Sequence, residues 1–382
     1  MNAHCMLVEF PVGGSSSSRV VGSAMFVSRE LELPPTKQRC LSSWEGRRLG
    51  ARQKSAAGKP PLPASQSTQK SFLALFLACV ALSARAVEPQ PVPRMQAVPQ
   101  PADQVSFQRD GLEIARYHFG PTLLRPFMFP IVGPAGRSLT RMGHPHDPVT
   151  HSHHNSFWLS HNDVNGVSFW DDRGNGRIVH QRIEEFVDDA TNAALQTASA
   201  WVTKDGKTLL NERRRITVQA LPGDEWLLIL DVQLTAVGTN AVTLGQTPFG
   251  LAGVRMAKTI GVKDGGGTIR NSEGGVNEAG VFRKPARWVD YSGPITATAS
   301  EGLTLLDHPS NPNHPSVFHV RDDGWMGASL TIAGARVIPP GQPLQLRYGL
   351  YVHAGLPAPE KIQQQWDAFS RTPPFDFKAK TK

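Results

Sequence analysis

Residues 194–237 read ALQTASAWVTKDGKTLLNERRRITVQALPGDEWLLILDVQLTAV and decide the fold class of this 382-residue chain. Apolar and polar side chains alternate over residues 197–203, and Asp205-Gly206 then supplies a hairpin turn. After a second turn at Pro222-Gly223, every other residue is leucine or valine: Leu228, Leu230, Val232 and Leu234. Residues at i and i+2 of a strand share a face, so these four form one apolar face. Consecutive hairpins of this length predict a large antiparallel sheet.

The same pattern of short alternating runs and turns continues from Val105 to Tyr351. Further strand candidates are residues 302–306, 329–332 and 344–348. The predicted fold is therefore all-β, a large antiparallel β-sandwich of two packed sheets. Near the end of the chain the period changes. Pro359 begins a segment whose apolar residues form one helical stripe: Ile362, Trp366 and Phe369. We expect this C-terminal helix to pack against the sandwich.

The beginning of the chain does not follow this pattern. Residues 1–69 contain a serine run and no sustained period of 2 or 3.6, so we expect a disordered or mis-assigned N-terminal extension. Residues 70–86 have a positive residue, an apolar run and then Ala84-Arg85-Ala86, which is typical of a secretory signal peptide. The other predicted segments are a Pro-rich linker at 87–104, the sandwich domain at 105–372 and a tail at 373–382.

The signal peptide predicts an exported protein, periplasmic or extracellular. The alternatives for its apolar run are a buried core helix or, because the run contains Cys79, a lipoprotein signal. The other cysteines, Cys5 and Cys40, also precede residue 87, so the mature chain has neither disulfides nor thiolate chemistry. It also has no apolar run of membrane-spanning length, so we expect no integral membrane segment.

The charge of the chain is unevenly distributed. Residues 1–86 contain 11 Lys/Arg and 4 Asp/Glu, whereas the remainder contains 29 and 28, a net charge of +1. A nearly neutral domain gives no support for nucleic-acid binding. We expect a carbohydrate or another small molecule as the partner.

Histidine is concentrated in one short segment. Six of the 13 histidines lie between residues 144 and 161: His144, His146, His151, His153, His154 and His161. On a strand, His151 and His153 would point to the same face. Paired imidazoles act as acid/base groups near neutral pH or bind a divalent metal. A zinc or copper site made of His151, His153 and His161 is therefore one interpretation, and a solvated polar loop is the other.

Aromatic and turn residues follow this segment. The aromatic residues are Phe157, Trp158, Phe169 and Trp170. They are either core residues or one wall of a sugar-binding cleft beside the histidines, where an aromatic ring stacks on a sugar. Asn165-Gly166 predicts a turn, which Asp163 and Asn165 would stabilise. Asp163, Asn165 and Trp170 are also candidates to bind a substrate.

A second group of candidates lies nearer the C-terminus. His308 belongs to a loop rich in proline and asparagine. His319 and Arg321 fall on one face of a predicted strand, and an arginine can form two hydrogen bonds to a carboxylate. His353 ends another strand. No pair of Asp or Glu residues indicates a glycosidase.

Several blocks resemble the PmoA-like family of exported bacterial proteins. They are residues 150–158, 161–170, 245–251, 288–293, 307–312, 318–321 and 347–355. The resemblance implies a sandwich similar to galactose-mutarotase-like, sugar-active folds, with the histidine blocks at one site. The sequence departs from the family pattern at His154-Asn155 and at Ser168, so roles that need Arg or Asp there are not carried over. The methane oxygenase in the family's name is not implied, because that membrane subunit needs several apolar spans.

The leading hypothesis is a carbohydrate-active enzyme: a hydrolase, a lyase or an epimerase. The candidate catalytic residues are His153, His161, His308, His319 and His353. The candidate substrate-binding residues are Asp163, Asn165, Trp170 and Arg321. The alternatives are a non-catalytic carbohydrate-binding module and a histidine-ligated zinc or copper protein.

Overall fold

The computed structural model describes residues 91–378. The predicted extension and signal peptide lie outside the described residues. Two large sheets and one two-stranded sheet make up the described part, and all strand neighbours in them are antiparallel. The prediction of an all-β antiparallel fold is therefore confirmed.

The first sheet has nine strands in the order β1-β2-β3-β4-β5-β11-β17-β16-β13. Their bounds are β1 Met95–Gln100, β2 Gln104–Arg109, β3 Leu112–His118, β4 Phe127–Ile131, β5 Phe157–His161, β11 Gly250–Arg255, β17 Trp325–Ser329, β16 Val317–Arg321 and β13 Lys284–Pro285.

The second sheet has eight strands in the order β12-β14-β15-β19-β9-β8-β7-β6. Their bounds are β12 Thr268–Asn271, β14 Trp288–Pro294, β15 Ser300–Asp307, β19 Leu344–Ala354, β9 Trp226–Ala236, β8 Thr208–Ala220, β7 Asn192–Thr203 and β6 Gly176–Asp188. The small sheet pairs β10 Val242–Leu244 with β18 Arg336–Ile338. The helices of the described part are α2 Val262–Gly265, α3 Asn277–Val281 and α4 Pro359–Ser370.

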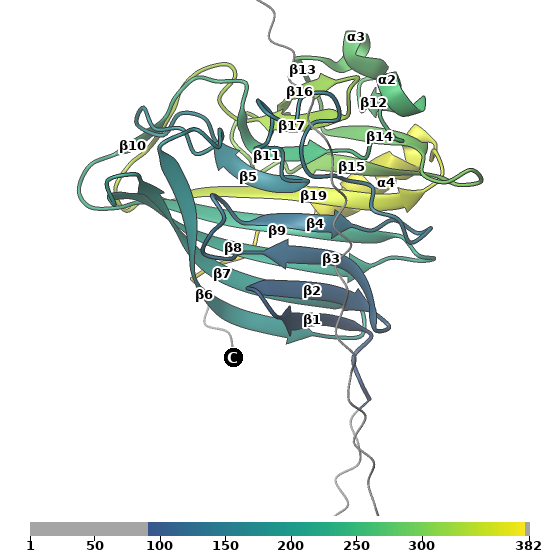
Figure 1. Ribbon diagram of the computed structural model, residues 1–382, viewed down its shortest axis with the longest axis horizontal. Helices are drawn as coiled ribbons and strands as arrows, with labels where there is room; N and C mark the ends of the chain where they lie inside the picture. Colours follow the sequence, from purple (N-terminus) through teal and green to yellow (C-terminus); the bar gives the residue numbers. More distant parts are fainter. Residues whose placement is uncertain (1–90, 379–382) are drawn as a thin grey trace, which may run out of the picture. The chain divides into compact units, whose positions relative to one another are not determined.

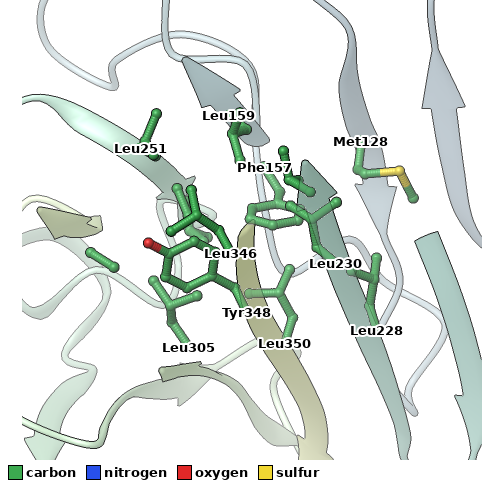
Figure 2. Close-up of a cluster of buried hydrophobic side chains, with 14 of the residues drawn as sticks. Met128, Phe157, Leu159, Leu228, Leu230, Leu251, Leu305, Leu346, Tyr348 and Leu350 are labelled. Atoms are coloured by element: carbon green, nitrogen blue, oxygen red, sulfur yellow. The ribbon is translucent and has the colours of Figure 1, made fainter. Parts of the chain in front are cut away.

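The hydrophobic core lies between the two large sheets. In Figure 1, strands β1 to β4 of the first sheet overlie strands β6 to β9 of the second. Figure 2 shows Phe157 and Leu159 of β5 near Leu228 and Leu230 of β9 and Leu346 of β19. The apolar face predicted for residues 228–234 is therefore confirmed as the inward face of β9.

The opposite face of the second sheet is covered by helix α4. Ile362 and Phe369 of this helix are buried against Leu227 of β9 and Tyr351 of β19. The helical stripe predicted from Pro359 onward is confirmed, since these residues need an apolar surface and the outer face of β9 and β19 supplies one.

The boundaries of the predicted linker and tail were wrong. β1 lies within residues 87–104, pairs with β2 from Met95↔Arg109 to Gln100↔Gln104, and buries Met95. Its Pro99 is tolerated because β1 ends the strand order, and an edge strand has one side without a ladder partner. In the predicted tail, Phe377 is buried and its carbonyl accepts a hydrogen bond from the Arg213 guanidinium.

Candidate functional site

Two rows of side chains on the first sheet form the floor of the site. Gly253 of β11 pairs with Gly327 of β17, and Gly327 pairs with His319 of β16. The next row consists of Arg255, Trp325 and Arg321 on the same three strands. Residues two apart on a strand share a face, so both rows lie on one face of the sheet. Their neighbours in sequence, such as Val254, Met326 and Val320, belong to the core, so this face is the outer one.

The paired glycines make room for an indole ring. A Cβ atom on Gly253 would lie 2.6 Å from Cη2 of Trp325, and one on Gly327 would lie 2.7 Å from Cζ2 of the same ring. The Trp325 ring therefore lies close against the backbone of β11 and β17 at these two glycines. Any larger residue at either position would displace the ring.

Aromatic rings pack around Trp325. Its ring centroid lies 5.4 Å from that of Trp158 and 5.6 Å from that of Trp170. The His154 imidazole stacks against both indoles, with its ring centroid 5.2 Å from that of Trp325 and 5.5 Å from that of Trp158. Burial holds the pKa of His154 far below its usual range, so this imidazole is neutral and acts as a packing element.

A cavity of about 700 Å³ opens above this floor. Its lining residues are His144, Thr150, His151, His153, His154, Asn162, Trp170, Asp171, Arg173, Phe249, Arg255, Phe282, Arg283, His319, Arg321, Asp323 and Trp325. Imidazoles, aromatic rings, guanidiniums and carboxylates thus face one space, as a small-molecule site requires.

His319 has a defined tautomer. The Trp325 indole N–H donates to Nδ1 of His319 over 2.7 Å, so the proton of the neutral ring is on Nε2. Burial, together with the Arg283 and Arg321 guanidiniums, lowers the pKa of His319 to about 4. At neutral pH His319 is therefore a neutral ring whose Nε2–H is a hydrogen-bond donor. The prediction that His319 and Arg321 share a face is confirmed, since both line the cavity.

His153 lies on the other side of the cavity. Its ring centroid is 4.6 Å from that of His154 and 5.7 Å from that of His151. Burial and the Arg125 guanidinium lower its pKa to about 4. Its Nδ1 is buried without a hydrogen-bond partner among residues 91–378. His151 to His153 form turns and not the strand on which their rings would share a face, but the two rings are adjacent as expected.

Histidine–aspartate contacts attach this loop to its surroundings. His144 Nδ1 accepts two backbone N–H groups, so its Nε2 donates to Asp323 over 2.9 Å. His146 contacts Asp264 over 2.7 Å, whereas the contact of 2.8 Å between His151 and Asp147 lies within the loop. Asp323 also accepts a hydrogen bond from Arg255, which fixes the loop relative to strand β11.

Three of the candidate catalytic histidines do not line the cavity. His161 is buried between Thr331 Oγ1, 2.8 Å from its Nε2, and the backbone N–H of Asp163, 3.1 Å from its Nδ1. His308 contacts the carbonyl of Thr372, and His353 contacts the buried carboxylate of Asp290 over 2.8 Å. The nitrogens of each ring form hydrogen bonds inside the fold. The prediction that these three histidines are catalytic was therefore wrong, and their roles are structural.

Asp163 and Asn165 also have structural roles. Asp163 Oδ1 accepts the Gly166 N–H, and Asn165 Oδ1 accepts the Thr243 N–H. Asn165 and Gly166 have φ angles of 51° and 83°, as the predicted turn requires. Their assignment as substrate-binding residues was wrong, because neither residue lines the cavity and these oxygens bind backbone N–H groups of the fold.

The predicted zinc or copper ligands do not come together. His151 and His153 are adjacent, but both ring nitrogens of His161 are engaged elsewhere. Within residues 91–378, no three His, Cys, Asp or Glu side chains are arranged around one metal position. The prediction of a zinc or copper site made of His151, His153 and His161 was therefore wrong.

Several site residues were not predicted from the sequence. They are Gly253, Arg255, Gly327, Asp323, Trp325, Asp171, Arg173, Phe249, Phe282 and Arg283. The Asp323-Gly324 turn is one signal that could have found some of them, because it joins β16 to β17 and brings Trp325 opposite Arg321. No local pattern pairs Gly253 with Gly327, which are far apart in the sequence.

The fold and the site define a class: a two-sheet antiparallel sandwich with a histidine- and tryptophan-lined cavity on an outer sheet face. Within this class, the chain belongs to a family of unknown function (DUF6807), whose model matches residues 104–367. A comparison with curated proteins gives no match.

Solved structures with some similarity to this chain include two of heparan sulfate lyase HepC from Pedobacter heparinus. A mutant of that lyase is 10% identical, with a TM-score of 0.35 over 76% of this chain and 42% of its own. The other HepC structure is 9% identical, with a TM-score of 0.34 over 76% of this chain and 41% of its own. A 4-alpha-glucanotransferase from Thermococcus litoralis is 9% identical, with a TM-score of 0.29 over 69% and 40%. The match thus spans about two-fifths of the length of these solved chains.

Proposed function

We propose that the protein is a carbohydrate-active enzyme whose active site is the cavity on the outer face of the first sheet. The observation that carries this proposal is one cavity lined both by aromatic rings and by two imidazoles that are neutral at neutral pH, His153 and His319. Aromatic rings stack on the apolar faces of sugars, and fixed polar groups hold the hydroxyls.

The two imidazoles have different roles in this proposal. His319 donates a hydrogen bond from Nε2 to a substrate oxygen, because Trp325 occupies its Nδ1. His153 transfers a proton to or from the substrate, since neither of its nitrogens has a partner among residues 91–378. Trp170 and Phe249 supply the aromatic walls.

The carboxylates of the cavity favour a lyase or an epimerase over a hydrolase. The Arg173 guanidinium lowers the pKa of Asp171 to about 2. Although burial opposes it, the Arg255 guanidinium holds the pKa of Asp323 below its usual range. Both groups are ionised and paired. Neither is a protonated general acid of the kind that a glycosidase with two carboxyl groups needs.

A second candidate is a non-catalytic carbohydrate-binding module. It is favoured by the low pKa of His153 and His319, because a general base works best with a pKa near the operating pH. In this case the imidazoles serve only as hydrogen-bonding groups.

Incubation of the purified protein with a panel of neutral and acidic oligosaccharides separates the two candidates. Mass spectrometry detects the products of hydrolysis and, in deuterated water, the hydrogen exchange that accompanies epimerisation. Ultraviolet absorbance detects the unsaturated sugars that elimination forms. The proposal predicts turnover of at least one saccharide. Saccharide binding without any product would favour the binding module.

We further propose that the protein is exported and that it is related to the PmoA-like family. The support is the apolar run before Ala84-Arg85-Ala86 and the order of the resembling blocks. N-terminal sequencing of the secreted product should begin at Val87, and a mature protein that begins before residue 70 would contradict export by this signal. Within residues 91–378, no helix has the length and apolar character of a membrane span.

A further inference from the structure

Guanidiniums outnumber carboxylates around the cavity. Among residues 91–378, four arginines line it, whereas the acidic lining residues are Asp171 and Asp323. The lining arginines are Arg173, Arg255, Arg283 and Arg321. The lining therefore has more guanidiniums than carboxylates, and such an excess of positive charge attracts an anionic ligand.

Two of these arginines are already neutralised inside the site. Arg255 is fully buried and contacts Asp323 over 2.8 Å, and Arg173 contacts Asp171 over 3.0 Å. The two lining arginines that have no carboxylate partner within the lining itself are Arg283 and Arg321. Arg321 contacts Glu278 over 3.0 Å, but Glu278 does not line the cavity, and half of the Arg321 side chain is exposed. Arg283 has no carboxylate within 4.0 Å among residues 91–378.

One aromatic ring positions both guanidiniums. Cζ of Arg283 lies 5.1 Å and Cζ of Arg321 lies 5.6 Å from the centroid of Phe282. The backbone of Arg283 has a φ of 55°, in the left-handed region that disfavours a residue with a side chain, and its N–H donates to the Phe318 carbonyl. The surrounding structure therefore holds the Arg283 backbone in this conformation.

We infer that the cavity takes an anionic saccharide, and that Arg283 and Arg321 bind a carboxylate of one of its sugar units. This inference rests on the proposed function and names the substrate class of the same site. A guanidinium presents two parallel N–H donors that match the two oxygens of a planar carboxylate. The Phe282 ring is beside these donors and 5.0 Å from the His319 ring, so the carboxylate site adjoins the hydrogen-bonding imidazole.

Calorimetric titration with matched saccharides tests the inference. The ligands are trisaccharides of galacturonate, glucuronate and mannuronate, each beside its fully methyl-esterified form, which keeps the sugar and removes the charge. We expect at least one acid form to bind about 10-fold more tightly than its ester, a difference of about 1.4 kcal/mol. This preference should weaken as salt is added, because the guanidiniums are exposed.

Variants then test which arginine causes the preference for the acid form over its ester. Arg283→Met should abolish it, and Arg283→Lys should restore only part of it, because a lysine keeps the charge but lacks the paired donors. Arg182→Met is the matched control. Arg182 is an exposed arginine paired with Glu184 on β6, outside the cavity, so the same loss of charge there should leave the preference intact.

The outcomes separate this inference from the proposed function. Equal binding of acid and ester, or a preference that survives Arg283→Met, overturns the inference while leaving a saccharide-binding cavity. Tighter binding of a sulfated trisaccharide than of any uronate would overturn the carboxylate assignment. Failure of every saccharide, charged or neutral, to bind would contradict the proposed function and the inference with it.

Discussion

A single hydrogen bond determines how His319 meets a ligand. Because the Trp325 indole donates to Nδ1, only Nε2–H is available to the cavity, and protonation of the ring would require Nδ1 to give up this donor. The indole itself can occupy its place only because Gly253 and Gly327 have no side chain. The chemistry of one imidazole thus depends on two backbone positions and one neighbouring ring.

Trp325→Phe tests this dependence, because phenylalanine keeps a ring over the glycines but removes the N–H donor. We expect a loss of about 10-fold or less in kcat/KM, the usual contribution of one hydrogen bond. Freed Nδ1 can then accept a proton, so the pKa of His319 should rise and the acidic limb of the pH–rate profile should move to higher pH. An unchanged profile would show that Trp325 does not position His319.

Gly253→Ala tests the close packing beneath the indole. The new Cβ would lie 2.6 Å from the Trp325 ring, so the ring must shift into the cavity. We expect saccharide affinity to fall by about 10-fold or more while the fold is retained. Gly334→Ala is the control, since a Cβ there has open space around it. Equal effects of the two substitutions on affinity would contradict the packing argument.

At the scale of elements, the sequence predicted those features that depend on local periodicity. The hairpins of residues 194–237 and the helix at Pro359 were found because alternation and a helical stripe are local signals. β1 was missed because prolines suggested a linker, whereas an edge strand tolerates Pro99. In the floor of the site, Gly253, Gly327 and Trp325 were missed because the pairing of β11 with β17 is long-range.

Helix α4 provides a prediction at this scale. Phe369 is buried against the outer face of the second sheet, so Phe369→Ala should lower the free energy of unfolding by about 3–5 kcal/mol. Urea denaturation measures this loss. Gln364→Ala, on the exposed side of the same helix, should change stability by less than about 0.5 kcal/mol. A small effect at Phe369 would mean that α4 contributes little to the stability of the sandwich.

For the whole molecule, histidine burial predicts how stability depends on pH. The pKa of His153, His161 and His319 is lowered by burial from an ordinary 6.5 to about 4. Between these values the unfolded chain binds more protons, so stability is full above about pH 6.5 and decreases as the pH falls toward 4. Asp171, with a pKa of about 2, loses its contribution only at lower pH.

Thermal unfolding at a series of pH values measures this effect. The melting temperature should decrease between pH 6.5 and 4, and His161→Gln, which removes one buried titrating ring, should make the decrease shallower. A slope that is unchanged in this variant would contradict the proton uptake assigned to His161.

The whole fold also explains why the histidines could not be sorted from the sequence. His161, His308 and His353 lie in resembling blocks, as several cavity residues do, yet each completes hydrogen bonds inside the fold. Which side of a sheet a histidine faces, and whether its nitrogens find partners there, depends on the packing of both sheets. Sequence patterns therefore predicted the region of the site correctly but included histidines that do not line the cavity.

The most direct test of the cavity as the active site compares His153→Gln with His161→Gln on the same saccharide. Both variants replace a buried imidazole with the same amide, but only His153 lines the cavity. We expect His153→Gln to lose turnover by about 100-fold or more, as loss of an acid–base group does. His161→Gln should retain turnover per folded molecule. Activity that survives in His153→Gln and disappears in folded His161→Gln would contradict this assignment.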